Sequence, residues 1–486
     1  MPHPPAACSG SPAGGALSRR RSPGTSGLLC PLHWVLFALA WTGIAVAAPA
    51  PDARLPVLSV ATDGLTPAEI GARLGAVTKA AFPDLEARWD TALASLLEPA
   101  QLPALMADVV APLRTEGVDA ATRAEVTGFA GALDLVGRTR LGDGHLSLDE
   151  LWLVQFLPDL VPLAAGSALA LHGRGPGDAP VLLGRNLDLP ASAALRGLQA
   201  ITRWQGARRT LVSAGLAGYL GVLNGFNEHG LYAALLAGPK RPAVRAAGAG
   251  ERAIGFAVRT ALASRDSAVG AAGMLRREAF VGSHSVLLGD AGEALVLELP
   301  AGKPAVLRRD DSATRPEMPW GQPGRLAVVN CLVAADIAGS CADLGDRFRW
   351  KRLRRLAAAD AAAGQGGTRA LLPMDLQAIL FDGIPRGYGI FNAATVQSMI
   401  FEPASGDLLL YAVGADGAHP AEPLMQRYVG LARTAGSGSG YPGAWVWVLA
   451  ALLLAGAAAA LWHFYPARST RRPSETVSTR SATWNQ

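Results

Sequence analysis

Three side chains with chemical potential are expected to meet at one edge of a β-hairpin. Between 163 and 190, two short apolar runs flank the turn-forming sequence RGPGD, and this pattern predicts a hairpin. Because a hairpin brings its ends together, Gly166 and Ser167 are expected beside Arg185 and Asp188. A hydroxyl, a fixed cation and a carboxylate would then share one sheet edge, and a hydroxyl becomes a nucleophile once a base takes its proton. A surface hairpin with a solvated Arg–Asp pair is the alternative.

Composition limits the classes of function. The chain has 486 residues, of which 50% are hydrophobic and 17% charged, so it can build a core and is not disordered. The formal charge of +5 owes much to arginines near the two ends, at 19–21 and at 468, 471 and 472. Without them the body is close to neutral, so no nucleic-acid partner is expected. The sequence has no CxxC or HExxH motif and predicts no zinc site.

Both ends of the chain carry membrane or export signals. Arginines precede an apolar run that ends in small alanines, which predicts a signal peptide over 1–48; an uncleaved anchor is the alternative. A Gly/Ser-rich linker, 431–443, precedes the uncharged stretch 444–462, which is long enough to span a bilayer. Arginines beyond that stretch place the tail, 463–486, in the cytoplasm. The main domain is therefore expected outside the cytoplasm, in the periplasm if the chain is bacterial.

The expected topology divides the four cysteines into two pairs. Cys8 and Cys30 lie in the expected signal peptide, whereas Cys331 and Cys341 remain in the body. An even pair in an exported protein predicts one disulfide, and two unpaired core thiols are the alternative.

The body is expected to begin with helices and to continue with strands. Residues 49–65 are expected to form a linker, and helix-start signals follow at Thr66 and Ser147. The helix from Ser147 is expected to end near Phe156, before Pro158. Later helices are expected at 253–264, 346–362 and 374–381, and strands at 210–213, 219–223, 231–235, 285–288, 294–299, 326–329, 395–401 and 408–412. This order predicts an α+β domain of layered sheets.

Several motifs, taken in order, resemble those of a known family. They are GRNLD at 184–188, GFNEHGL at 225–231, the pair at 329–330, the arginine-rich helix that starts near Asp346, and TVQSMIFEP at 395–403. Together they resemble the penicillin acyltransferase-like branch of the N-terminal nucleophile hydrolases, over roughly residues 121–414. Carcinine hydrolases, bile-salt hydrolases and acid ceramidases are more distant relatives of that branch.

The resemblance implies a four-layer αββα fold in which two antiparallel sheets pack face to face, without a cofactor or metal. Residues 167–430 would form this domain, and 49–166 would be a helical propeptide or α-subunit-like segment. The family cleaves itself, and the freed N-terminal residue attacks an amide with its own α-amine as the base.

The resemblance also assigns roles to single residues. Asp188 would hold the α-amine, and Arg185 would orient the nucleophile or substrate. Asn227 would help to form an oxyanion hole, Asn330 matches a second asparagine of the family, and Arg347 matches an arginine that steadies the site.

One departure from the family leaves the function open. The family's nucleophilic cysteine is absent, and Gly166 and Ser167 stand at the aligned place. Either Ser167 is the nucleophile, freed by cleavage between these two residues, or Gly166 takes the cysteine's place and the site is inactive. Cys331 as an internal nucleophile is a less simple account than a disulfide.

The expected function is a membrane-anchored amidohydrolase or acyltransferase that acts on a small-molecule or lipid-like amide. A catalytically inactive binding module of the envelope, and a lipid amidase resembling acid ceramidases, are the alternatives.

Overall fold

The computed structural model describes residues 54–432, apart from 136–138, 162–164, 173–179, 190–192, 240–245, 339–340, 365–371, 384–388 and 415–416. The expected signal peptide, the transmembrane stretch 444–462, the tail and nearly all of the linker lie outside the described residues. Among those described, no single helix is both long and apolar enough to cross a membrane. One pair, Leu85–Leu96 with Pro99–Gly117, meets these criteria only when its two helices are taken together, across an 89° bend.

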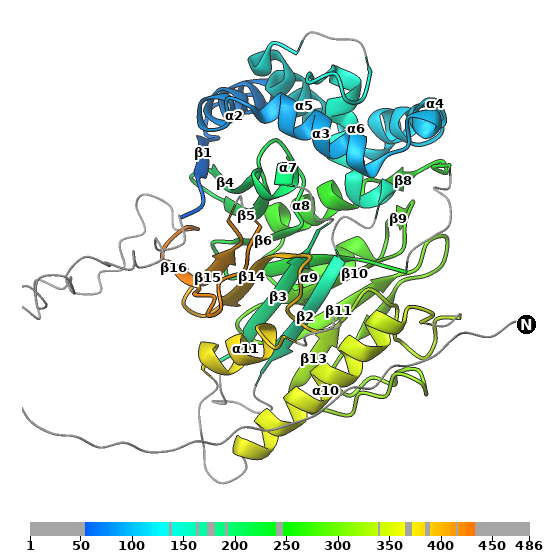
Figure 1. Cartoon of the computed structure of the whole chain (residues 1–486), viewed down its shortest axis with the longest axis vertical. Coiled ribbons are helices and arrows are strands. Elements are labelled where there is room, and N and C mark those ends of the chain that lie inside the picture. The colour runs from blue at the N-terminus through cyan, green and yellow to red at the C-terminus, as the bar shows by residue number, and fades with distance from the viewer. Residues whose placement is uncertain are drawn as a thin grey trace, which may run out of the picture. The chain divides into compact units, whose positions relative to one another are not determined.

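A layer of helices precedes all but the first strand of the sheets, and the sequence predicted these helices (Figure 1). Thr66 and Glu69 form a capping box at the start of α2 (Pro67–Ala81), and Ser147 and Glu150 form another at α6 (Leu148–Leu160). α6 continues through Pro158 to Leu160, so the expected end near Phe156 is wrong. The other members of this layer are α3 (Leu85–Leu96), η1 (Pro99–Gln101), α4 (Leu102–Leu105), the π-helical turns η2 (Met106–Val110) and η3 (Leu113–Gly117), and α5 (Ala120–Leu133).

Sheet A, with eight strands, lies under these helices. In spatial order its strands are β1 (Val57–Ala61), β4 (Gln199–Gln205), β5 (Thr210–Leu216), β6 (Asn224–Asn227), β7 (Tyr232–Ala237), β10 (His284–Gly289), β11 (Ala294–Leu299) and β12 (Val306–Arg308). Within the described part of sheet A, only β1 pairs in parallel, with β4. The expectation of a linker at 49–65 is therefore wrong for 57–61, because this segment forms an edge strand.

Sheet B, with six antiparallel strands, holds the hairpin. Its order is β13 (Arg325–Val328), β2 (Ala165–Leu171), β3 (Leu182–Asp188), β14 (Thr395–Glu402), β15 (Asp407–Ala412) and β16 (Gln426–Tyr428). The expected domain boundary between 166 and 167 thus falls within β2. The expected strand at 219–223 is wrong, since those buried residues form a loop.

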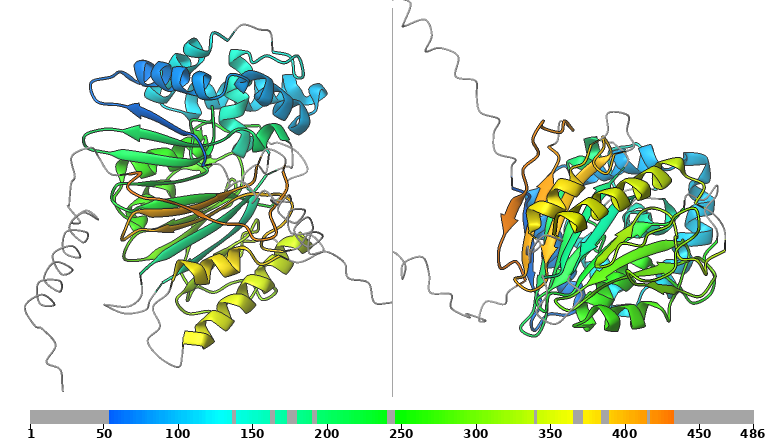
Figure 2. Two further views of the ribbon diagram at one scale, coloured as in Figure 1. Left: turned by 60° about the vertical axis from the view of Figure 1, so that its left-hand side comes forward. Right: turned by 90° about the horizontal axis from the view of Figure 1, so that it is seen from below.

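Three apolar cores separate four layers, seen from the side in Figure 2. The first joins the helical layer to sheet A and contains Trp89 and Phe129. The second lies between the sheets, where Phe226 of sheet A stacks on Phe401 of sheet B with ring centroids 4.4 Å apart. The third joins sheet B to α10 (Leu344–Gly364) and α11 (Pro373–Leu380), with Trp350 fully buried. The αββα layering expected from the sequence is the observed architecture.

Shorter elements complete the described chain. They are α7 (Ala193–Arg196), α8 (Ile254–Ser264), α9 (Ala268–Leu275) and a two-stranded ribbon of β8 (Glu251–Arg252) and β9 (Ala279–Phe280). α8 and α9 contact sheet A, so they add to the helical layer on its outer face.

Candidate functional site

The predicted hairpin is present, and its register fixes which side chains meet. β2 pairs with β3 so that Ala165 lies opposite Asp188 and Ser167 lies opposite Asn186. Arg185 lies opposite Ala168. Because alternate residues of a strand point to opposite faces, Ser167 shares a face with Asn186 and Asp188, whereas Arg185 points to the other face.

Asp188 is the centre of a buried polar cluster. Its side chain is 5% exposed and accepts hydrogen bonds from Thr395 Oγ1 at 2.7 Å and Asn392 Nδ2 at 3.1 Å. Arg349 Nη1 lies 3.3 Å from the same carboxylate. Burial raises the pKa of the Asp188 carboxyl, and the Arg349 guanidinium is the largest opposing influence.

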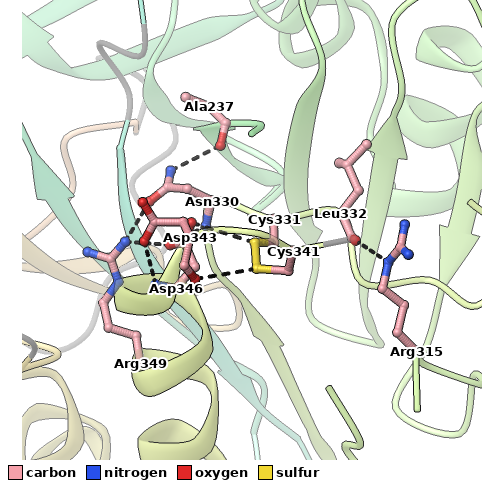
Figure 3. The surroundings of a disulfide bond; sticks show 9 residues. All are labelled: Ala237, Arg315, Asn330, Cys331, Leu332, Cys341, Asp343, Asp346 and Arg349. Carbon is pink, nitrogen blue, oxygen red and sulfur yellow. Dashed lines mark hydrogen bonds and ion pairs between the residues drawn. A yellow bond between two sulfur atoms is a disulfide. The ribbon is translucent and has the colours of Figure 1, made fainter. Parts of the chain in front are cut away.

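Asn330 and Arg349 connect this carboxylate to the start of β2. Arg349 Nη2 donates to Asn330 Oδ1 at 3.1 Å and to Asp346 Oδ1 at 2.5 Å (Figure 3). Asn330 Oδ1 also accepts from the backbone N–H of Gly166 at 3.0 Å, and Asn330 Nδ2 donates to the Ala237 carbonyl at 3.0 Å. The asparagine therefore ties sheet A to the residue that precedes Ser167.

The backbone at position 166 requires glycine. Its φ of +138° is rarely adopted by residues with a side chain. A Cβ at this position would lie 1.9 Å from the Asn186 carbonyl oxygen. The close approach of β2 to β3 therefore depends on the absence of a side chain at 166.

Ser167 is fully buried and faces the α11 side of sheet B. Its neighbour Asn186 donates to the carbonyls of Leu380 at 2.7 Å and Ile390 at 2.8 Å, and accepts from Ser398 Oγ at 2.7 Å. Ser167 Oγ has no hydrogen-bond partner among the residues that the structure describes. It is a hydroxyl buried within sheet B, and the Gly166–Leu187 pair lies between its own pair and the pair that contains Asp188.

Arg185 lies between the two sheets. Its Nη1 donates to the Leu223 carbonyl at 2.8 Å and to Asn224 Oδ1, both from sheet A or the loop before it. The side chain is fully buried, and burial lowers its pKa to about 10. Arg185 thus joins the sheets and lies on the opposite face from Ser167.

Asn227 is committed to a turn, which corrects its expected role as an oxyanion donor. Its Oδ1 accepts from the N–H groups of His229 at 3.0 Å and Leu231 at 3.1 Å. Its Nδ2 donates to the carbonyls of Leu262 at 2.9 Å and Arg265 at 2.8 Å. An amide nitrogen has two protons, so none remains for a ligand.

Arg349, not Arg347, is the arginine of α10 that contacts the cluster. Two residues along a helix correspond to a rotation of about 200°, so the two side chains point in nearly opposite directions. The expectation for Arg347 is corrected accordingly: its half-exposed side chain makes no ion pair among the described residues. The buried residues Trp350 and Leu353 mark the inward face, and this phase could have identified Arg349 and Asp346 from the sequence.

The predicted disulfide between Cys331 and Cys341 is present (Figure 3). It closes a loop directly after Asn330, and both sulfurs lie near Asp346. Sulfurs joined to each other supply neither a thiolate nucleophile nor thiolate metal ligands. Cys331 as an internal nucleophile is therefore excluded in this state.

Asn392 and Thr395 contact Asp188, and neither was predicted from the sequence to be a site residue. Thr395 begins the TVQSMIFEP motif, and Asn392 lies three residues earlier in an irregular segment. His419 lies beside them, with Nε2 3.2 Å from the Asn392 carbonyl oxygen and Nδ1 2.9 Å from the Tyr411 hydroxyl. Partial burial lowers the pKa of His419, so the neutral ring is favoured.

Comparison with known proteins gives similarity to solved structures alone. No protein-family model matches the chain, and no curated protein matches it. An N-acylethanolamine-hydrolyzing acid amidase (NAAA) ortholog from Caenorhabditis elegans is 17% identical over 49% of this chain and 92% of its own, with a TM-score of 0.35. A single-substitution variant of conjugated bile acid hydrolase from Clostridium perfringens is 13% identical over 55% of this chain and 94% of its own, with a TM-score of 0.35.

Penicillin V acylase from Agrobacterium tumefaciens is 14% identical over 54% of this chain and 86% of its own, with a TM-score of 0.33. These proteins are named as an N-acylethanolamine-hydrolyzing amidase, a bile acid hydrolase and a penicillin acylase, and none of them singles out the penicillin acyltransferase-like branch. The chemistry that this chain's own site allows follows from its contacts.

Proposed function

We propose that the Asp188 cluster binds an amide-bearing ligand without cleaving it through Ser167. The observation that carries this proposal is the register of the hairpin, which puts Ala165 opposite Asp188. In N-terminal nucleophile chemistry a carboxylate would hold the α-amine of the attacking residue. The residue that the register places opposite Asp188 is Ala165, whose methyl side chain cannot attack an amide.

Ser167 is poorly placed to replace a nucleophile at 165. It lies two residues farther along β2, which corresponds to about 6.6 Å. Its hydroxyl faces Asn186, while Arg185 points into the space between the sheets. Asn227 has no free amide proton for an oxyanion, because both are donated to the end of α8. Ser167, Arg185 and Asn227, the three groups expected to act together in cleavage, are thus separated from one another.

The cluster still offers groups that suit an amide. Arg349 Nε is buried and has no hydrogen-bond partner among the described residues, so it is an unsatisfied donor that a ligand carbonyl would satisfy. The carboxylate of Asp188 can accept from an amide N–H. The ligand class, a small-molecule or lipid-like amide, comes from the sequence resemblance.

A second candidate, an amide hydrolase or acyltransferase acting through Ser167, is favoured by one specific observation. The Ser167 hydroxyl is buried without a partner among the described residues, and such groups in native structures require an explanation. Gly166, with its φ of +138°, precedes it and would be the residue before a self-cleaved bond.

Intact-mass measurement of the mature full-length chain separates the two candidates. The binding proposal predicts one polypeptide whose mass is unchanged, apart from the substitution, in Ser167→Ala. Ser398→Ala is the matched control, because Ser398 donates to Asn186, the residue opposite Ser167. Two polypeptides cut between 166 and 167, and their loss in Ser167→Ala alone, would overturn the binding proposal and establish the hydrolase.

Binding is tested separately with N-dodecanoylethanolamine as the probe. We expect Asn392→Ala to weaken binding while the substituted chain stays folded by circular dichroism, because Asn392 contacts Asp188. Equal binding by Asn392→Ala and the unsubstituted chain would contradict a ligand site at this cluster.

We further propose that the chain is anchored by a single span at 444–462, with its main domain outside the cytoplasm. The uncharged apolar stretch, the arginines after it and the export signal at 1–48 support this topology. Protease added to intact spheroplasts should degrade the body; its protection there, with digestion after lysis, would contradict the orientation.

A further inference from the structure

The basic run of α10 has a second surface that the Asp188 cluster does not use. Arg349 points inward, and Arg352 is paired with Asp382. The next cations along the helix, Lys351, Arg354 and Arg355, line a hollow of about 440 Å³ together with Pro319, Gln322, Trp350 and Ala358. This volume lies within the range of small-ligand pockets, about 300–1,000 Å³.

The charge of this hollow is not neutralised by its own walls. None of the described residues that line it is acidic. Among the described residues, Lys351, Arg354 and Arg355 make no ion pair. Arg354 Nε donates to the Trp320 carbonyl at 2.6 Å, which fixes the direction of the guanidinium. Two guanidinium groups and one ammonium line this hollow without a carboxylate among its described lining residues, and such a set favours a phosphate oxyanion.

An apolar surface lies beside these cations on the same helix. Trp350, Pro319 and Ala358 give the hollow an apolar wall. One turn and two turns before Lys351, the side chains of Phe348 and Leu344 are 53% and 62% exposed. The positions 344, 348, 351 and 355 follow the spacing of a single helix face. A face that is both basic and apolar is typical of helices that lie on anionic membranes.

We propose that this hollow binds the phosphate of an anionic phospholipid head group. Its charge and its apolar rim both match a lipid at a membrane surface better than a free anion, which has no acyl chains for Leu344 and Phe348. The expected span begins at 444, and the last described residue is 432, so the two are 12 positions apart. So short a connection would keep the body close to the bilayer.

The test uses the full chain in a non-ionic detergent and dihexanoylphosphatidylglycerol as the probe, with bound lipid counted by native mass spectrometry. We expect Lys351→Gln/Arg354→Gln/Arg355→Gln to weaken binding about a hundredfold, at roughly fivefold for each lost cation. The double variant Lys351→Gln/Arg355→Gln keeps the Arg354–Trp320 bond and should weaken binding about twenty-five-fold.

The matched control removes three cations elsewhere, as Arg276→Gln/Arg277→Gln/Lys303→Gln, and should bind as the unsubstituted chain does. Equal binding of dihexanoylphosphatidylcholine, or equal affinity for glycerol 3-phosphate or inorganic phosphate, would overturn the assignment to an anionic lipid. Tighter binding of a short RNA, abolished by the same substitutions, would overturn it in favour of a nucleic acid.

Discussion

Replacement of Arg349 by methionine tests the account of the buried cluster most directly. Arg349 is the cation beside two nearly buried carboxylates, Asp188 and Asp346, each with a side chain 5% exposed. It also donates to Asn330 Oδ1. Methionine keeps much of the volume and removes the charge and all the donors. Both carboxylates are then left without the cation that the native structure gives them.

The expected loss of unfolding free energy is about 3–5 kcal/mol, the range for breaking a buried ion pair by removal of one partner. An exposed ion pair would contribute below about 1 kcal/mol, so the burial of both carboxylates decides the magnitude. Thr395 and Asn392 still donate to Asp188, which keeps the expected loss within this range rather than above it.

The loss is expected to depend on pH with a definite sign. Burial raises the pKa of both Asp188 and Asp346, so the native state binds their protons more tightly than the unfolded chain does. The stability that these two groups contribute is therefore present at low pH and is lost as pH rises through their raised pKa values. Arg349 opposes both shifts, and its removal raises the two pKa values further. The deficit of Arg349→Met should grow between pH 5 and pH 7.5.

Urea unfolding of the full chain, followed by tryptophan fluorescence at both pH values, measures this deficit. Arg347→Met is the control, because its side chain lies on the other face of α10, and it should change stability by less than about 0.5 kcal/mol. A deficit for Arg349→Met below about 1 kcal/mol, a deficit that does not change with pH, or an equal deficit for Arg347→Met would refute the reasoning.

Three other perturbations have definite expected results. Gly166→Ala should destabilise the chain by more than about 3 kcal/mol, because its Cβ would lie 1.9 Å from the Asn186 carbonyl; unfolding free energy within about 1 kcal/mol of the unsubstituted chain would contradict this. Cys341→Ser should cost about 2–3 kcal/mol, since the disulfide closes a loop of sequence separation 10, and a reductant should reproduce that loss in the unsubstituted chain alone. Burial raises the pKa of Asp159 to about 8, so between pH 5 and 8 the unsubstituted chain should lose stability relative to Asp159→Asn; parallel stability curves would exclude a protonated Asp159.

Local signals in the sequence were sufficient for elements that depend on local physics. The capping boxes at Thr66 and Ser147 place their own N–H partners three residues ahead, so the helix starts were predictable. The hairpin was predictable from its turn residues and its two apolar runs. β1 was missed because its partner, β4, lies far along the chain, and no local turn announces a parallel pairing.

The apolar run 219–223 was wrongly predicted to be a strand because its residues are buried in a loop. Its residues are as buried as those of a strand, but they lie in a loop under α8, where the Val222 N–H donates to the Gly255 carbonyl at 3.0 Å. Burial alone does not distinguish a strand from a buried loop, because both exclude polar side chains.

Site residues were predictable only where a hairpin or a short closed loop fixes their position. Asp188 and Asn330 lie at the cluster because the hairpin and the disulfide loop bring them there. Asn227 could not be judged from its motif, since its partners belong to α8, far along the chain. For α10 the two-residue error between Arg347 and Arg349 is an error of helix phase, since the apolar residues Trp350 and Leu353 indicate the inward face.

The register of one hairpin decides between a ligand site and a nucleophile, and Gly166 holds that register. A slip of β2 by two residues would keep every side chain on its face and would bring Ser167 opposite Asp188. It would also place Ala168 where Gly166 now lies, so a Cβ would meet the Asn186 carbonyl oxygen at 1.9 Å. The bond from the Gly166 N–H to Asn330 would be lost as well. The same glycine that permits the close pairing of β2 and β3 therefore keeps the Ser167 hydroxyl away from the Asp188 carboxylate.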